Sequence, residues 1–238
     1  MPDFQPAPAR LPEDHRVYAV GDVHGCDERL ARLHRLIAAD LAARPVPRPL
    51  LLHLGDYVDK GPDSAGVVTR LAAEPPLPGV PTVNLMGNHE RTMLDALDGQ
   101  PAAVTDWLYS GGEQALASWR IDPASPVAGW AEAVPAPHKA FLKGLALHHR
   151  LGGYVFVHAG LKPGVPLDRQ SPDDLLRIRR TFLDSGADFG AVVVHGHTPV
   201  RHGPELLHNR INLDTGAVFG RELTCGVLEA DRIGFLFA

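Results

Sequence analysis

The sequence predicts an α/β fold, because short apolar runs alternate along the chain with segments whose apolar residues recur at helical spacing. The runs are rich in branched and aliphatic residues and are continuous, which is typical of strands buried on both faces. Most runs lead through a polar loop into a helical segment, so the predicted order is strand, loop, helix, strand. The predicted strands span residues 17–20, 50–54, 82–86, 154–157 and 191–194.

The predicted elements begin after a proline-containing start. Residues 1–14 combine prolines with small and polar residues, a composition that buries little surface and predicts a flexible N-terminal tail. Leucine and isoleucine then recur at helical spacing over 27–43, which predicts a crossover helix after the first strand. Residues 64–73 and 91–97 repeat this pattern more briefly and predict two further helices.

The second half of the chain departs from this alternation. Residues 105–147 interrupt the alternation and carry none of the ordered metal-ligand motifs, so we expect a helical insert near the functional site. Residues 211–214, 223–228 and 233–237 are β-type segments separated by glycines and an aspartate, and they predict a closing antiparallel ladder. The proline-rich stretches have ordinary loop lengths, so residues 15–238 are expected to form one domain.

Composition excludes several classes of protein. Apolar residues make up 45% of the chain and charged residues 21%, as in ordinary globular proteins. A net charge of -5 supplies no basic field for a nucleic-acid backbone, so no stable nucleic-acid partner is expected. No apolar run is long enough to span a membrane. Two distant cysteines, Cys26 and Cys225, and a start unlike a secretory signal predict a cytoplasmic protein.

Five polar motifs follow five of the predicted strands, and their side chains offer mainly oxygen and imidazole donors. Loops at the carboxyl ends of neighbouring strands converge on one crevice, so residues remote in sequence can meet there. Hard and borderline divalent cations prefer these donors, which predicts a two-metal site, with manganese expected and iron or zinc as alternatives. The motifs are Gly-Asp-Val-His-Gly at 21–25, Gly-Asp-Tyr-Val-Asp at 55–59, Gly-Asn-His-Glu at 87–90, His-Ala-Gly at 158–160 and His-Gly-His-Thr at 195–198.

Ligand chemistry suggests how the motifs divide between two ions. Asp22 and His24 stand two residues apart in an extended segment, so both can point toward the first ion. Asp56 is expected to bridge the ions, because a shared carboxylate offsets their mutual repulsion. Two such ions would ionise a shared water near neutral pH, and the resulting hydroxide is the expected nucleophile. The expected ligands of the second ion are Asn88, His158 and His197.

Taken together with residues 212–217, the five motifs resemble the calcineurin-like metallophosphoesterase superfamily. More narrowly, they resemble the PPP-type serine/threonine protein phosphatases in their compact bacterial and phage form. The resemblance covers nearly the whole chain from Arg16 onward. It implies a central β-sandwich flanked by helices, in four layers ordered α/β/β/α. It also implies the same division of the six ligands between two metal ions.

The resemblance further implies the residues that handle the proton and the phosphate. His89, partnered by Asp59, would protonate the leaving alkoxide, since a nearby carboxylate raises the pKa of a histidine. Glu90 is expected to steady the same loop. The family usually has an arginine where this chain has Lys60, which keeps the charge but loses the two-pronged hydrogen bond. A second phosphate-binding arginine is expected among three residues, of which Arg179 matches best; the candidates are Arg177, Arg179 and Arg180.

Several other residues are expected to have structural roles. His53 lies in an apolar run and is expected to be a hydrogen-bonded core histidine. His195 stands two residues from His197 and is expected to support the ligands from outside. The three tryptophans are expected to lie in the core; lining a substrate groove is the alternative. The remaining histidines considered are expected to be solvated: His34, His138, His148, His149, His202 and His208.

Three functions are compatible with these residues. The first is a metal-dependent phosphomonoester hydrolase acting on phosphoserine or phosphothreonine in proteins or peptides, with dual specificity toward phosphotyrosine left open. The second is symmetrical hydrolysis of dinucleoside polyphosphates, such as diadenosine tetraphosphate, or of a nucleotide cap on RNA. The family resemblance favours the first, because the nucleotide branch typically carries asparagine in place of Asp59. The third is a silent phosphate-binding module, which intact ligands and His89 disfavour.

Overall fold

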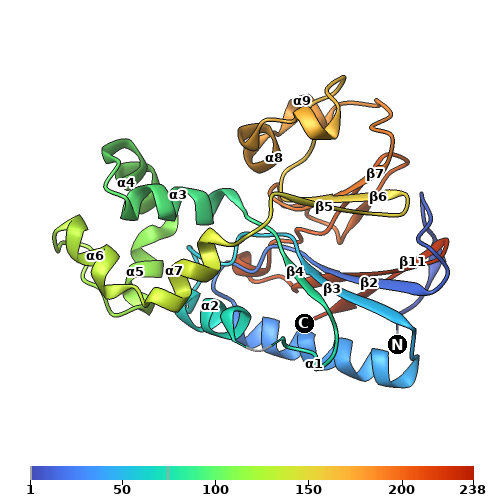
Figure 1. The fold of residues 1–238 in the computed structure, drawn as a ribbon, viewed down its shortest axis with the longest axis horizontal. Helices are drawn as coiled ribbons and strands as arrows, with labels where there is room; N and C mark the ends of the chain where they lie inside the picture. The colour runs from blue at the N-terminus through green and yellow to red at the C-terminus, as the bar shows by residue number, and fades with distance from the viewer. Residues whose placement is uncertain (1, 74) are drawn as a thin grey trace.

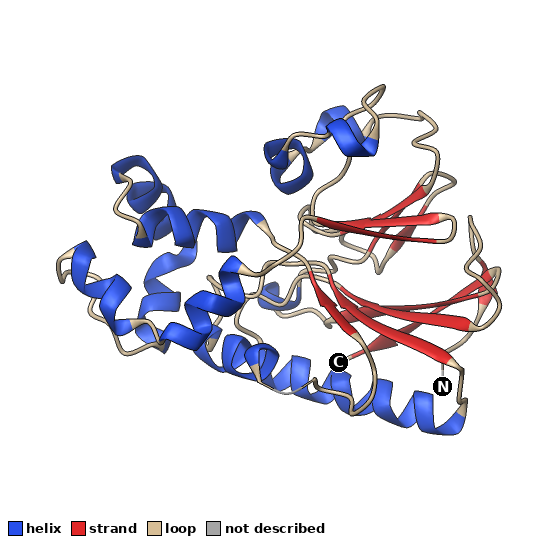
Figure 2. Ribbon diagram, viewed as in Figure 1, coloured by secondary structure: helices blue, strands red, loops and turns tan. Residues whose placement is uncertain are grey.

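The computed structural model describes residues 2–73 and 75–238. Two β-sheets lie face to face, and helices cover the outer side of each sheet (Figures 1 and 2). The layers therefore follow the order helix, sheet, sheet, helix, which confirms the predicted α/β class and its four-layer form. Among the described residues, none of the helices is both long and apolar enough to cross a lipid bilayer.

The first sheet has six strands in the order β1-β11-β10-β2-β3-β4. Its strands β2, β3 and β4 run parallel, whereas β10 is antiparallel to both β2 and β11. Their bounds are β1 (Gln5–Pro6), β2 (His15–Val20), β3 (Arg48–His53), β4 (Thr82–Asn84), β10 (Thr224–Glu229) and β11 (Arg232–Phe237). The helices α1 (Asp27–Ala43) and α2 (Ser64–Ala72) follow β2 and β3, as predicted, and α1 lies along the outer face of this sheet (Figure 1).

The second sheet has five strands in the order β5-β6-β7-β9-β8. The three central strands, β6, β7 and β9, run parallel. The bounds are β5 (His148–Leu151), β6 (Tyr154–Val157), β7 (Val192–His195), β8 (Glu205–Leu206) and β9 (Arg210–Asn212). The short helices η2 (Leu167–Arg169), α8 (Pro172–Arg177) and α9 (Arg180–Leu183) follow β6, and Leu175 and Phe182 pack against the outer face of this sheet.

The central strands are buried on both faces, which explains their continuous apolar runs. In β6 all four residues are buried. Tyr154 and Phe156 pack between the sheets, whereas Val155 and Val157 pack toward α8 and α9. Strand β2 divides in the same way, since Val17 lies between the sheets and other β2 side chains face α1. Alternate residues thus serve two different apolar layers, and no polar face is left to reveal the strand period.

A group of helices stands at one end of the sandwich (Figure 1). It occupies the stretch in which a helical insert was expected, and Trp107 and Trp130 are fully buried within it, with ring centroids 5.9 Å apart. A π-helical turn joins α4 to α5 and contains Gly111 with φ at 110°. The elements are α3 (Asn88–Leu97), α4 (Pro101–Trp107), η1 (Leu108–Gly112), α5 (Glu113–Ser118), α6 (Val127–Ala133) and α7 (Ala136–Lys143).

Two expectations about the chain ends are wrong. Residues 2–14 do not form a free tail, because Gln5 pairs with Ile233 of β11 and Leu11 is only 3% exposed; Met1 lies outside the described residues. Proline is tolerated in β1 because this strand lies at the edge of the sheet, where a missing N–H breaks no internal ladder. The C-terminal segments do not form a single antiparallel ladder either, since β9 joins the second sheet parallel to β7.

His34 was expected to be solvated, and the structure corrects this. The side chain is buried on α1, with Nε2 2.9 Å from Nε2 of His53, so the two rings share one hydrogen bond. Nδ1 of His53 donates to Oδ1 of Asn84 at 2.8 Å. His53 therefore accepts at Nε2 and His34 donates. The expectation that His53 is a hydrogen-bonded core histidine agrees with these contacts.

This buried pair predicts a loss of stability in acid. Burial lowers the pKa of His34 to about 4 and that of His53 to about 3. In the unfolded chain both histidines would titrate near the ordinary histidine pKa. Below about pH 6.5 the unfolded state therefore binds more protons at these two residues than the native state does. The free energy of unfolding should therefore fall by up to about 1.4 kcal/mol per pH unit for each histidine as the pH drops toward 4.

The measurement is urea unfolding from pH 7.5 to 4.5 for the wild type and for His34→Gln, whose amide can still donate to His53. The variant should show a shallower dependence on pH, because it lacks one depressed histidine. His202→Gln, on an exposed loop, is the matched control and should leave the slope unchanged. Parallel curves for the wild type and His34→Gln would contradict the prediction.

Candidate metal centre

Loops from both sheets converge at the carboxyl ends of their parallel strands. The loop after β2 carries His24, and the loop after β3 carries Asp56. His89 lies in the first turn of α3, which follows β4. His158 directly follows β6, and His197 lies just beyond β7. The site is therefore assembled from both sheets. The five motifs predicted that the ligands meet at strand ends, but not that the strands belong to two sheets.

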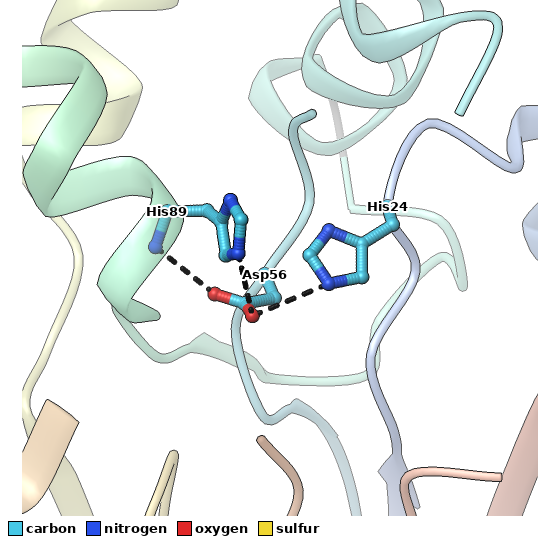
Figure 3. A group of neighbouring side chains, drawn as sticks. All are labelled: His24, Asp56 and His89. Carbon is cyan, nitrogen blue, oxygen red and sulfur yellow. Dashed lines mark hydrogen bonds and ion pairs between the residues drawn. The ribbon is translucent and has the colours of Figure 1, made fainter. Parts of the chain in front are cut away.

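Asp56 lies at the middle of the site (Figure 3). Its Oδ2 is 3.4 Å from Nε2 of His24 and 3.9 Å from Nε2 of His89. Its Oδ1 is 3.3 Å from Nε2 of His158 and accepts a hydrogen bond from the backbone N–H of His89 at 3.2 Å. Burial alone would raise the pKa of Asp56, but the surrounding histidines outweigh it and hold the pKa well below its usual range. The carboxylate is thus charged, with one oxygen facing His24 and His89 and the other facing His158.

The buried donor atoms form two groups that could each hold a metal ion. His24, Asp56 and His89 form one group, and Asp56, His158 and His197 form the other; within each, the candidate ligand atoms lie within 4.8 Å of one another. Asp56 belongs to both, which is the arrangement that a bridging carboxylate requires. Oδ1 of Asn88 is 3.0 Å from Nε2 of His158 and so lies beside the second group.

Backbone carbonyls orient two of the imidazoles. Nδ1 of His24 donates to the carbonyl of Val58 at 2.8 Å, and Nδ1 of His158 donates to the carbonyl of Leu54 at 3.0 Å. Each bond fixes the proton on Nδ1 and leaves the lone pair of Nε2 directed toward Asp56. Metal-bound histidines commonly have their second nitrogen held in this way. Burial lowers the pKa of both histidines, which favours the neutral form that binds metal.

Two orphaned atoms test whether this donor set fits cations. Oδ1 of Asp22 and Nε2 of His197 are buried and have no hydrogen-bond partner among the residues that the structure describes. The other oxygen of Asp22 accepts from the backbone N–H of His197 at 3.0 Å, so the two residues are held side by side. A buried acceptor left unpaired is costly, whereas the same atom is satisfied as a ligand. The donor set therefore fits divalent cations, and all six expected ligands lie around this one centre.

Asp214 is a site residue that the predictions missed. It lies two residues beyond the end of β9. Its side chain is buried, with the residue 3% exposed, and it accepts a hydrogen bond from the backbone N–H of Gly216 at 3.0 Å. Burial, with the nearby charge of Asp56, raises its pKa to about 6, and Asp214 in turn raises the pKa of Asp22 beyond the effect of burial. Unneutralised carboxylates so close together are a further sign of a cation site. The signal that could have identified Asp214 is the same as for the five motifs: a carboxylate just after the end of a parallel strand.

His89 and Asp59 form a buried pair beside this centre. Nδ1 of His89 donates to Oδ2 of Asp59 at 2.7 Å, and Oδ1 of Asp59 accepts from Nε1 of Trp107 at 2.8 Å. Burial would lower the pKa of His89, but Asp56 and the bond to Asp59 outweigh it and raise the pKa. With Nδ1 occupied, Nε2 of His89 is the nitrogen that faces Asp56 and the centre (Figure 3).

The two expected phosphate-binding residues lie on opposite sides of the centre. Nζ of Lys60 is 2.9 Å from Nε2 of His24, so its charge lies within the site. Arg179 is exposed, and its Nη1 is 3.4 Å from Oγ1 of Thr198, next to His197. Arg177 instead donates to Oγ1 of Thr92 at 2.8 Å. Of the three candidate arginines, Arg179 is therefore the one with a contact beside a ligand.

His195 lies outside both metal-binding groups. Its ring is buried against Phe182, with centroids 5.0 Å apart, and its Nδ1 is 3.0 Å from the carbonyl oxygen of Gly196. Gly196 itself must lack a side chain, because a Cβ there would lie 1.9 Å from Oδ1 of Asp22. The turn between His195 and His197 thus places one histidine on each side of the sheet end.

Left-handed backbone conformations are concentrated at this site. Five of its residues other than glycine have positive φ angles, a region that is disfavoured by contact between Cβ and the backbone. Such strain persists only where the surrounding contacts impose it. The residues are His24 at 42°, Asp56 at 54°, Asp59 at 72°, Lys60 at 65° and His197 at 67°.

Glu90 holds the strained loop after β3. Its fully buried carboxylate accepts hydrogen bonds from the backbone N–H groups of Asp56 at 2.9 Å, Tyr57 at 2.7 Å and Val58 at 3.1 Å. It also accepts from the N–H of Gly87 at 2.8 Å, which joins this loop to the start of α3. Glu90 was expected to steady the loop that carries His89, and the bond to Gly87 agrees with this. The other three bonds show that Glu90 mainly holds the loop after β3.

Glu90→Gln should therefore destabilise the protein. Each carboxylate oxygen accepts from two backbone N–H groups, so replacing one oxygen by the amide NH2 leaves two buried N–H groups facing a donor. We expect the free energy of unfolding to fall by roughly 2–4 kcal/mol, measured by urea denaturation. Glu132→Gln, on the exposed face of α6, is the matched control and should change the unfolding midpoint little. Equal midpoints for both variants would contradict the role assigned to Glu90.

The chain matches the family model of calcineurin-like phosphoesterases over residues 15–236. It is 32% identical to serine/threonine-protein phosphatase 1 of Salmonella typhimurium, over 87% of this chain and 89% of the relative. It is 28% identical to an asymmetrical bis(5'-nucleosyl)-tetraphosphatase of Bacillus velezensis, over 86% of each chain. A crystal structure assigned provisionally as a diadenosine tetraphosphatase has a TM-score of 0.60 and 26% identity, and the match covers 97% of this chain and 98% of that one. The chain therefore belongs to the calcineurin-like phosphoesterase family, whose members are metal-dependent hydrolases.

Proposed function

We propose that this protein hydrolyses phosphomonoesters, with phosphoserine and phosphothreonine in proteins or peptides as the leading substrates. The observation that carries the proposal is the buried pair of His89 and Asp59, joined at 2.7 Å beside the shared carboxylate of Asp56. A histidine held in this way can deliver a proton to an alkoxide, which is a poor leaving group. The relative from Salmonella typhimurium, named a serine/threonine phosphatase, supports the same assignment.

Six residues would hold two divalent ions in this proposal. When bound, the ions lower the pKa of water and neutralise charge on the phosphate. Asp56 keeps the two positions together, and neutral Asn88 limits the negative charge around the second. Manganese is the expected metal, because the set mixes oxygen and imidazole donors. The ligands are Asp22 and His24 on one side, Asp56 between, and Asn88, His158 and His197 on the other.

Lys60 and Arg179 would bind the phosphate oxygens from opposite sides. The ammonium of Lys60 supplies a compact charge without the planar fork of a guanidinium, so it attracts the phosphate but orients it less strictly. Arg179 is exposed near His197 and can supply the two-pronged contact. Together they would hold the phosphorus between the ligand cluster and Nε2 of His89.

His89 would then protonate the leaving oxygen as water attacks from the opposite side. Asp59 keeps the proton on Nδ1 and turns Nε2 toward the centre. Because attack is direct, the proposal includes no phosphorylated side chain. Single-turnover labelling with a ³²P-labelled substrate should therefore leave the protein unlabelled, and a trapped phosphoprotein would overturn this mechanism.

Hydrolysis of dinucleoside polyphosphates is the second candidate. Two observations favour it: the 28% identical relative from Bacillus velezensis carries that activity in its name, and so does the provisional assignment of the 26% identical structure. The alternative from the sequence is symmetrical cleavage of a dinucleoside polyphosphate, or removal of a nucleotide cap. The relative from Bacillus velezensis is instead named for asymmetrical cleavage. The same ligand cluster would serve either reaction, so substrate rates must distinguish them.

The deciding experiment compares kcat/KM for a phosphothreonine peptide and for diadenosine tetraphosphate, with metal analysis of the same preparation. We expect the phosphopeptide to be preferred and manganese to restore activity after chelation. A hundredfold preference for the nucleotide would replace the first proposal by the second. A metal-loaded protein without turnover on either substrate, or on an aryl phosphate, would favour a silent binding module. The free thiols of Cys26 and Cys225 suit the cytoplasmic location that we also propose.

A further inference from the structure

Trp107 reaches the site from the helical group at the end of the sandwich. It ends α4, and its indole N–H donates to Asp59 at 2.8 Å. We propose that Trp107 is a positioning residue, which fixes the carboxylate of Asp59 and through it the proton-donating ring of His89. The inference rests on the proposed function, because it concerns the residue assigned to protonate the leaving group.

The hydrogen bonds of Asp59 leave its carboxylate one orientation. Asp59 is fully buried, with Oδ2 bonded to Nδ1 of His89 and Oδ1 bonded to Nε1 of Trp107. Its backbone N–H donates to Oγ of Ser64 at 2.9 Å, which fixes the main chain at the same point. Without the indole N–H, a buried carboxylate oxygen would lose its partner, and rotation of the group would no longer break a second bond.

Trp107 is itself held firmly enough to act as a support. It is fully buried and packs edge-on against Trp130 at 5.9 Å. Gly112 lies directly on the ring, since a Cβ there would be 2.7 Å from Cδ2 of Trp107. In the same turn the carbonyl of Gly111 accepts from the backbone N–H of Lys60 at 3.2 Å. Residues 107–112 therefore hold both the side chain of Asp59, through Trp107, and the backbone of Lys60, through Gly111.

A positioning role for Trp107 predicts a kinetic effect that a packing role does not. Proton donation by His89 matters for a poor leaving group and matters little for a good one. Misplacing the ring should thus slow hydrolysis of phenyl phosphate much more than hydrolysis of 2,4-dinitrophenyl phosphate. A general loss of packing would slow both substrates alike or would only lower stability. The ratio of the two rates is therefore the informative readout.

Trp107→Phe removes the N–H and keeps an aromatic ring. We expect kcat for phenyl phosphate to fall about tenfold, and kcat for the dinitrophenyl ester to change less than about twofold, with KM little altered for either. Trp119→Phe is the matched control, because its Nε1 donates to Nδ1 of His138 at 2.9 Å, away from Asp59. The control should keep the wild-type ratio.

Three comparisons make the test decisive. An equal change on both substrates, or equal behaviour of the two tryptophan variants, would overturn the inference. If Trp107→Phe fails to fold, replacement of the Trp107 indole by benzothiophene removes only the N–H, and the same criteria apply. His89→Ala separates this inference from the proposed function: an unchanged ratio there refutes the proton donor itself, whereas a changed ratio with Trp107→Phe unaffected refutes only the role of Trp107.

Discussion

Replacing His89 with alanine should lower kcat for phenyl phosphate by about 10² to 10⁴, the usual contribution of a general acid. The reason is geometric. Nδ1 of His89 is bonded to Asp59 at 2.7 Å, which leaves Nε2 facing Asp56 and the space where the leaving oxygen would lie. The loss should be small for 2,4-dinitrophenyl phosphate, whose leaving group needs no proton. Steady-state kinetics on both esters measures the effect.

Metal content is the second readout for this variant, because His89 also belongs to one of the two groups of candidate ligand atoms. A proton donor can be removed without loss of metal, so His89→Ala should bind as many ions per chain as the wild type. A variant that loses one ion would identify His89 as a ligand and contradict the role proposed here. His208→Ala, on an exposed loop, controls for the loss of an imidazole and should retain both activity and metal.

Asp56→Asn should produce a loss at least as large, by way of metal binding. The amide preserves the size of the side chain but removes the charge that His24, His89 and His158 surround at 3.3–3.9 Å. Both groups of donor atoms share this residue, so neither should hold an ion tightly without it. We expect turnover to fall by roughly 10³ or more, which corresponds to the several kcal/mol that bound metals supply.

Calorimetric titration with manganese and elemental analysis measure this effect independently of turnover. The wild type should bind two ions per chain, and Asp56→Asn should bind fewer ions with weaker affinity. Asp106→Asn, an exposed acid on α4, is the matched control and should resemble the wild type. If Asp56→Asn retained two tightly bound ions, a bridging role for Asp56 would be refuted.

The convergence of the ligands was predictable because two independent signals coincide at each motif. A continuous apolar run predicts a buried parallel strand, and the polar residues after it must then lie at the strand's carboxyl end. Asp56 and His158 follow this rule, although they come from different sheets. The division into two sheets was not predictable from the runs themselves, since β2 and β6 have the same apolar pattern. It followed only from the family resemblance.

Errors arose where a partner remote in sequence decides the environment. Residues 2–14 have the composition of a free tail, but β11 offers an edge with which Gln5 pairs. His34 counts as polar in a helical pattern, and only the opposing His53 on β3 makes its burial tolerable. Trp107 was expected in the core from its size alone. Its bond to Asp59 depends on the path of the helical group, which local patterns do not determine.

The left-handed backbone at His24, Asp56, Lys60 and other site residues constrains attempts to engineer a more heat-resistant enzyme. Glycine or asparagine would relax these positions, so a screen that rewards only a higher melting temperature should select changes there. Such variants would lose the geometry on which turnover depends. Tolerance to heat should instead be sought far from the strand ends, for instance on the solvent-facing side of α1, where improved helix propensity leaves the catalyst untouched.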